Sequence, residues 1–306
     1  MDNNHNGRPV FGCVFGAAGG GPEETGVTGL WGSSKALFLW ELATCAGKPG
    51  RPVLVLASGQ KEAETLSSDI RFFAGEDAGS SAYFPPWDVL PYDVMEPDPS
   101  VISERLSVLK KMHDGTARLV VTPVKAFMQR LNDPAALVSG KAGLTLSTGS
   151  GYGHERLVLG LSAMGYARAD MVYEPGEFSV RGGIIDVYPP GGGGPVRVEF
   201  LGDTVESMRG FDPDTQRSHT AVDKVELFPV SEQPEEDGGR QFDLADFFSS
   251  PPVIVLDEPS RTLHAASEFD GRVRTAYEST GGDTDALPPE ALYMAPDEAV
   301  ARILSL

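Results

Sequence analysis

Cysteine and histidine are scarce in this sequence, and their scarcity narrows the kinds of site that it can hold. Only two of the 306 residues are cysteines, Cys13 and Cys45, which are too few for a disulfide scaffold and lack a C-x-x-C spacing. The five histidines are scattered, with no H-x-x-x-H pair among them. We therefore expect a protein of a reducing compartment that has no metal site.

Long apolar runs are missing as well. No stretch reaches the roughly 18 consecutive apolar residues that a membrane-spanning helix needs. The residues before Val10 are polar and do not have the basic start of a secretory signal. The sequence thus predicts a cytoplasmic location.

Basic residues are outnumbered by acidic ones. The chain has 25 Lys and Arg against 44 Asp and Glu, a net charge of -19 and an isoelectric point of about 4.6. Such a charge repels nucleic acid phosphates, so we expect this chain alone not to bind DNA non-specifically. The hydrophobic fraction of 41% is enough for ordinary cores, and the length suggests about two domains.

A glycine-rich turn at residues 27–36, V-T-G-L-W-G-S-S-K-A, resembles a phosphate-binding loop, whose pattern is G-x-x-x-x-G-K-[ST]. Gly29 and Lys35 take the first glycine and the lysine positions, but Ser34 replaces the second glycine. Ala36 replaces the hydroxyl residue that holds Mg²⁺, and a methyl group cannot ligate a cation that demands oxygen. We expect a loop that has lost its chemistry; an ordinary turn that starts a helix fits this segment equally well.

A second motif of the same kind follows the aliphatic run at 253–256. Asp257 and Glu258 follow that run directly. In ATPases with a phosphate loop, an acidic motif that holds Mg²⁺ has the same place after a strand. A buried strand with an acidic turn at its end is an equally good interpretation.

Residues 27 to about 135 alternate between short aliphatic runs and helical runs. The runs at 53–57, 119–121 and 253–256 are as continuous as those of strands buried on both faces, and helical spacing follows the first of them at 60–73. This alternation predicts a parallel sheet wrapped by helices.

The pattern changes between about 142 and 231. After a helical run at 154–164, the sequence predicts short strands at 184–188, 196–200 and 204–208. We therefore predict an α/β fold in which a degenerate RecA-like parallel-sheet domain carries an inserted small α+β domain. The predicted parts are a flexible N-terminal segment at 1–26, the sheet domain at 27–141 and 232–306, and the inserted domain at 142–231.

One long stretch within the inserted domain is specific enough to indicate a family. Residues 166–190 read Y-A-R-A-D-M-V-Y-E-P-G-E-F-S-V-R-G-G-I-I-D-V-Y-P-P, and 195–217 continue P-V-R-V-E-F-L-G-D-T-V-E-S-M-R-G-F-D-P-D-T-Q-R. This stretch resembles the second domain shared by UvrB, the nucleotide excision repair helicase, and the Mfd-type transcription-repair coupling factors. In that family the domain is the docking surface for UvrA, so the resemblance implies UvrA as a partner.

Further segments favour the coupling factors over UvrB. Three segments look like the Mfd version of this region: 84–93, which reads F-P-P-W-D-V-L-P-Y-D, 102–109 and 122–131. The long aromatic hairpin that UvrB wedges into DNA is absent. UvrB also keeps an intact phosphate loop. The resemblance, which covers roughly 27–265, is therefore to the N-terminal, UvrB-homologous region of the coupling factors. Trp87 and Tyr92 are expected to fold back onto the sheet domain rather than to stack on bases.

The resemblance also implies which residues bind UvrA. Strand alternation at 196–200 places Arg197 and Glu199 on one side of the sheet. A further arginine of the family's set is replaced here by Ser179, and the alternative for the charged residues is a solvated strand surface. Phe200 fits a core position equally well. The implied UvrA-binding residues are Arg168, Arg181, Arg197, Glu199 and Phe200.

The function that the resemblance implies is recruitment of UvrA to stalled RNA polymerase, without ATPase activity or catalytic residues in this chain. Coupling factors continue into an RNA-polymerase-interacting domain and a two-lobed translocase, so ATP, Mg²⁺, DNA and RNA polymerase are expected to be bound by the rest of a longer parent. The alternative is the nucleotide-binding lobe of a UvrB-like DNA repair helicase. A third interpretation, compatible with the first, is an autoinhibitory module whose UvrA-binding face is masked by the C-terminal region of its parent.

Overall fold

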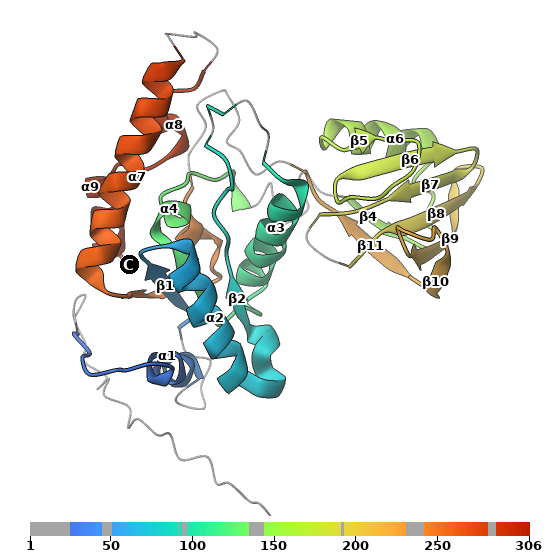
Figure 1. The fold of residues 1–306 in the computed structure, drawn as a ribbon. Helices are drawn as coiled ribbons and strands as arrows, with labels where there is room; N and C mark the ends of the chain where they lie inside the picture. The colour runs from blue at the N-terminus through green and yellow to red at the C-terminus, as the bar shows by residue number, and fades with distance from the viewer. Residues whose placement is uncertain are drawn as a thin grey trace, which may run out of the picture.

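A computed structural model describes residues 25–44, 51–90, 92–93, 97–134, 144–190, 193–230, 242–280 and 286–306. Three features of the sequence lie outside these residues: the two cysteines, most of the predicted flexible segment at 1–26, and the acidic stretch at 231–239. Figure 1 shows two bodies side by side, one built around a parallel sheet and one made mostly of antiparallel strands. The predicted α/β fold with an inserted domain is confirmed.

The parallel sheet has the strand order β12-β1-β3-β2. Every residue of β1 and β3 is buried, as expected for strands covered by helices on both faces. Along β1, Val53, Val55 and Ala57 join one core cluster and Leu54 and Leu56 join the other, because successive side chains point to opposite faces. The strands are β1 Val53–Ala57, β2 Ser81–Tyr83, β3 Leu119–Pro123 and β12 Val253–Leu256.

Helices cover both faces of this sheet (Figure 1). On one face α1 and α2 pack against alternate residues of β1 and β3, and on the other lie α3, α4 and α7. The bounds are α1 Ser34–Thr44, α2 Gln60–Ala74, α3 Pro99–His113, α4 Val124–Phe127, α7 Pro259–Ser279, α8 Pro289–Leu292 and α9 Pro296–Leu304, with two 3-10 helices, η1 Gly75–Ser80 and η2 Leu244–Phe247.

The segment after β2 packs back onto the sheet domain around a buried arginine. Arg105 of α3 is fully buried, donates to the carbonyl oxygen of Pro85, and lies 4.1 Å from the centroid of the Phe84 ring. Trp87 is also buried, and the hydroxyl of Tyr92 donates to the carbonyl oxygen of Leu287 at 2.9 Å. The expectation that Trp87 and Tyr92 pack against the domain is confirmed.

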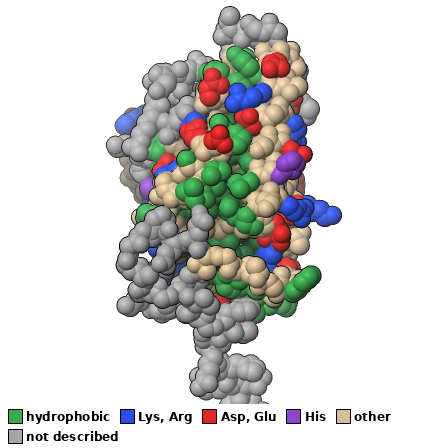
Figure 2. Space-filling view, turned by 90° about the vertical axis from the view of Figure 1, so that its left-hand side faces the viewer, with side chains coloured by type: hydrophobic (Ala, Val, Ile, Leu, Met, Phe, Trp, Pro, Cys, Tyr) green, Lys and Arg blue, Asp and Glu red, His purple; other side chains and the backbone are tan. Residues whose placement is uncertain are grey.

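The C-terminal residues, in which the sequence shows no motif, complete the sheet domain. Arg302 of α9 donates to Asp243 Oδ2 at 2.6 Å and to Asp246 Oδ1 at 2.7 Å, which ties the last helix to η2. Figure 2 shows the face on the side of α7 and α9, where Lys and Arg side chains are interspersed with Asp and Glu around a patch of hydrophobic side chains.

The second body contains a six-stranded sheet of order β10-β9-β8-β7-β6-β5 and a separate pair, β11-β4. One face of the large sheet is buried against α6 and this pair, through residues such as Leu157, Leu161, Leu146 and Leu227. The elements are β4 Leu144–Ser147, α6 His154–Ala163, β5 Ala167–Arg168, β6 Glu177–Arg181, β7 Ile184–Val187, β8 Val196–Leu201, β9 Thr204–Phe211, β10 Ser218–Ala221 and β11 Lys224–Leu227.

A lysine connects the two bodies. Lys110 of α3 forms ion pairs with Asp114 and, across the boundary, with Glu226 of β11, each at 3.0 Å, and its Nζ lies 5.3 Å from the centroid of the Phe228 ring. Lys224 approaches the same Glu226 carboxylate at 2.7 Å. The hydrogen bonds from Lys224 and Lys110 lower the pKa of Glu226 below its ordinary value.

We expect Glu226→Gln to lower stability at neutral pH by up to about 1 kcal/mol, and to have no effect in acid. A lowered pKa means that the folded state favours the carboxylate. That contribution is present above the ordinary glutamate pKa of about 4.3 and is lost as the pH falls through the lowered folded value. Urea unfolding of both proteins at neutral and acid pH checks this, and a gap of the same size at both pH values would contradict it.

Candidate functional site

The hairpin that joins β6 to β7 needs its two glycines for different reasons. Gly182 has φ of +60°, which residues with a side chain rarely adopt. A Cβ on Gly183 would lie 3.1 Å from the carbonyl oxygen of Phe200, whose own N–H donates to Gly183 O at 2.8 Å. This tight turn pairs Arg181 with Ile184 and so places Asp186 of β7 between its neighbours in the sheet.

Asp186 is the centre of a charged cluster on the sheet face opposite α6. It lies directly across from Arg197 in the register of β7 and β8, and its side chain is only 1% exposed. Arg197 Nε donates to Asp186 Oδ1 at 2.7 Å and Nη2 donates to Oδ2 at 2.9 Å, a two-point contact that suits the planar guanidinium. Arg181 Nη2 also donates to Oδ2, at 2.6 Å. We call these three residues the arginine–aspartate cluster.

The two arginines of the cluster have different surroundings. The Arg197 side chain is 18% exposed, lies 5.1 Å from the centroid of the Phe211 ring, and has a raised pKa because of its hydrogen bonds to Asp186. The Arg181 side chain is 48% exposed and uses one terminal nitrogen on Asp186. Since a guanidinium has five N–H donors, Arg181 keeps donors that face solvent. Arg197 is thus held against Asp186 by two hydrogen bonds, and Arg181 by one.

Glu199 lies on the same face as this cluster. Its Oε2 accepts a hydrogen bond of 2.6 Å from the Ser207 hydroxyl, and in the register it lies across from Ile184. The alternation predicted along β8 therefore holds from Val196 to Phe200, although the register with β9 shifts between Glu199 and Phe200.

The other two residues that the resemblance implies lie elsewhere. Phe200 packs against the core cluster of the second body, with its ring centroid 5.4 Å from that of His154. Arg168 of β5 is exposed at the sheet edge, and the register aligns it with the buried Phe178 rather than with the polar residues of β6. The structure thus brings together Arg181, Arg197 and Glu199, but not Arg168 or Phe200, and the role of all five in binding stays a prediction.

Asp186 was not identified from the sequence as a site residue, nor was the place of Ser179 beside it. Asp186 was missed, although a single charge within the aliphatic strand I-I-D-V was a usable signal. Ser179 was recognised only as the replacement of an arginine, and it is buried directly across from Asp186.

The segment that resembles a phosphate loop lies beside the acidic residues that follow β12, and its role stays a prediction. Gly29 and Gly32 have φ of +80° and +56°, and α1 begins at Ser34. Lys35 Nζ lies 2.5 Å from Asp257 Oδ1 and 3.9 Å from Glu258 Oε1.

Ala36 is fully buried in the core cluster beneath α1, so no side-chain oxygen is available where Mg²⁺ would be held. The lysine that would reach a phosphate is paired with a carboxylate of this chain. These residues therefore do not fit a magnesium–nucleotide complex. In the parts of the chain that the structure describes, no group of three or more His, Cys, Asp or Glu could hold a metal ion. Nor is any helix within those parts long and apolar enough to cross a membrane.

Comparison with known proteins supports the resemblance. Residues 144–232 match the family model of the UvrB interaction domain, a range that includes all of β5–β10 and the arginine–aspartate cluster. The chain is 33% identical to the transcription-repair-coupling factor of Haemophilus influenzae over 194 residues, 63% of this chain and 16% of that protein. The chain is therefore similar to part of the transcription-repair-coupling factors.

Other relatives extend the match. The chain is 30% identical to the coupling factor of Bacillus subtilis over 255 residues, 82% of this chain and 21% of that protein. It is 27% identical to the coupling factor of Escherichia coli over 318 residues, 90% of this chain and 27% of that protein. The chain therefore spans between 16% and 27% of the length of these curated relatives.

Proposed function

We propose that this chain is the adaptor module of a transcription-repair coupling factor, which binds UvrA through the sheet face of Arg181, Arg197 and Glu199. In this proposal it recruits UvrA to stalled RNA polymerase for nucleotide excision repair. The match to the UvrB interaction domain and the similarity to coupling factors support it. The observation that carries it is the half-exposed Arg181, which a buried, braced carboxylate holds in one geometry.

Preorganisation is the physical reason why this face suits docking. An exposed arginine normally loses much rotamer freedom when it binds a partner, which costs affinity. Arg181 is already fixed by Asp186 at one nitrogen, so its remaining donors are presented without that cost. Titration of UvrA into the chain by calorimetry tests the proposal: we expect saturable binding, and no heat of binding at micromolar concentrations would contradict it.

The rest of the proposed activity belongs to a longer parent. ATP and Mg²⁺ would be bound by its translocase part, and RNA polymerase and DNA would be contacted through other domains. The C-terminal region of the parent would mask the UvrA-binding face when the protein is not engaged.

A second candidate function is the nucleotide-binding lobe of a UvrB-like helicase. The observation in its favour is that Lys35 and Asp257, 222 residues apart, meet as the lysine and acid of a nucleotide site do. Against it stand Ser34 and the buried Ala36, so we propose that the chain is not an enzyme and needs no cofactor.

We expect no ATP hydrolysis from this chain, even after Ser34→Gly and Ala36→Thr restore the motif. The physical reason is that a helicase-type ATPase also needs an arginine finger from a second lobe. Steady-state phosphate release with Mg-ATP, with Lys35→Met as the matched background, provides the measurement. Turnover in the wild-type chain that disappears in Lys35→Met would contradict the proposal and favour the helicase lobe.

A further inference from the structure

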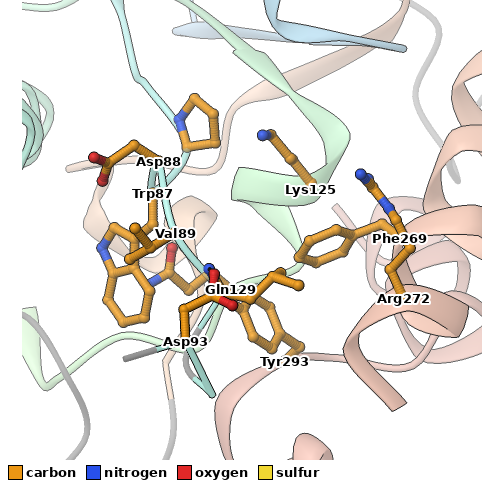
Figure 3. A pocket seen from close by; sticks show the side chains of 11 residues that line it. Trp87, Asp88, Val89, Asp93, Lys125, Gln129, Phe269, Arg272 and Tyr293 are labelled. Carbon is orange, nitrogen blue, oxygen red and sulfur yellow. Dashed lines mark hydrogen bonds between the residues drawn. The ribbon is translucent and has the colours of Figure 1, made fainter. Parts of the chain in front are cut away.

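A cavity of about 140 Å³ lies in the sheet domain, and it shares no residue with the sheet face or the phosphate loop. It is lined by the segment that follows β2, by α4 and the second residue after its end, by α7 and by the residue that follows α8 (Figure 3). Trp87, Phe269 and Tyr293 supply aromatic walls. We call it the Lys125 cavity, after the lysine that lines it.

Two basic side chains, Lys125 and Arg272, line the Lys125 cavity, and the nearby Asp88 offsets the charge of Lys125 only in part. Within the described part of the chain, neither Lys125 nor Arg272 forms an ion pair, although acidic residues outnumber basic ones by 44 to 25. Arg274, two residues further along α7, is paired with Asp270 at 2.8 Å. Lys125 is half-buried, and burial followed by the charge of Arg272 lowers its pKa. Lys125 is thus a partly desolvated cation beside the exposed, like-charged Arg272, and an anion bound between them would offset both the desolvation and the repulsion.

A buried amide in the same cavity also lacks a partner. Gln129 is 2% exposed, and its Oε1 accepts a hydrogen bond of 2.8 Å from Arg105 Nη2. Because arginine can only donate, this bond fixes which end of the amide is oxygen. Gln129 Nε2 is therefore a buried donor with no acceptor, and Figure 3 shows Gln129 in the middle of the cavity lining. An unpaired buried donor costs free energy that a hydrogen-bond acceptor would recover.

Two carboxylates at the cavity limit what can bind there. Asp93 Oδ2 accepts the N–H of Leu90 at 2.8 Å, and Asp88 Oδ1 accepts the N–H of Asp98 at 3.3 Å. Both acids line the cavity with Lys125 and Arg272. They would repel a polyanion such as a nucleoside triphosphate more strongly than they repel one small oxyanion group, which carries less charge.

We propose that the Lys125 cavity binds a single oxyanion group, a carboxylate or a phosphate. Lys125 and Arg272 supply positive charge, and Gln129 Nε2 donates a hydrogen bond that orients the group. Charge-assisted hydrogen bonds to basic side chains are about twice as strong as neutral ones, and the partial burial of Lys125 reduces the screening of its charge. The group can come from a free anion such as phosphate or from an acidic side chain, for which acetate is the probe.

Thermal unfolding at constant ionic strength tests the proposal, with sodium phosphate or sodium acetate replacing sodium chloride. Ligand that binds only the folded state raises Tm in a saturable way. We expect such a rise with at least one of the two anions. Lys125→Gln and Arg272→Gln are each expected to weaken binding about tenfold, and Arg274→Gln, the matched control on α7, is expected to leave it unchanged.

The relative size of the two shifts identifies the source: a larger effect of acetate indicates a carboxylate, and a larger effect of phosphate indicates a free phosphate. The Tm of each variant in sodium chloride shows whether it is folded. Lys125→Gln removes a cation that has no ion pair within the described residues, so it should not lower this Tm. Equal shifts in the wild type, Lys125→Gln and Arg272→Gln, or no shift with either anion, would overturn the proposal.

Discussion

Arg197→Ala is expected to lower the free energy of unfolding by about 3 kcal/mol or more. The side chain of Asp186 is 1% exposed, and Arg197 satisfies both of its oxygens. Removing the guanidinium leaves a buried carboxylate with only the single contact from Arg181. Urea unfolding followed by circular dichroism gives the difference directly.

The matched control for this change is Arg209→Ala. Arg209 lies across from Arg197 in the register of β8 and β9, but it is exposed. Its replacement should change stability by no more than about 0.5 kcal/mol. Combining Asp186→Ala with Arg197→Ala should cost less than the sum of the two single changes, because the buried charge is gone. A loss at Arg197 no larger than that at Arg209 would show that the arginine–aspartate cluster does not brace the sheet.

Arg181→Ala is expected to weaken UvrA binding by about 2 kcal/mol, or roughly 30-fold. Arg181 is the exposed member of the cluster, and arginine is a common anchor at protein interfaces because its planar fork pairs with carboxylates. Stability should fall by no more than about 1 kcal/mol, because Arg197 still holds Asp186. Calorimetric titration with UvrA and urea unfolding of the same variant measure both quantities.

Arg156→Ala is the matched control for binding, since Arg156 is exposed on α6, against the opposite face of the sheet. Arg197 is a poor choice for a binding test, because its replacement is expected to disturb the fold as well. If Arg181→Ala binds UvrA as tightly as the Arg156→Ala control, Arg181 is not an anchor.

The parallel sheet could be predicted because its strands carry their own signal. Strands β1 and β3 are continuous aliphatic runs, which a strand buried on both faces requires. The contact of Lys35 with Asp257 was not predicted, because the two residues are 222 positions apart and the sequence marks each motif only by itself. The helix α7 was not predicted, although Pro259 at its first position and the buried residues Ala266, Phe269 and Val273 at helical spacing were usable signals.

The charged sheet face could be predicted only in part. Alternation along β8 placed Arg197 and Glu199 correctly on one side, since that pattern is local. The contact of both arginines with Asp186 depends on the register between three strands, which no single strand encodes. The position of Phe200 was predictable, because the same alternation places it with Val196 and Val198 on the core side. Arg168 lies in a two-residue edge strand, which is too short to recognise in a sequence.

The most direct test of the proposed docking face is arginine footprinting of the complex. The free chain and its complex with UvrA are treated with an arginine-specific reagent such as phenylglyoxal, and the modified side chains are quantified by mass spectrometry. Arg181, with a 48% exposed side chain, should react in the free chain and be protected several-fold in the complex, while Arg156 reacts equally in both. An Arg181 that reacts to the same extent with and without saturating UvrA would contradict the account.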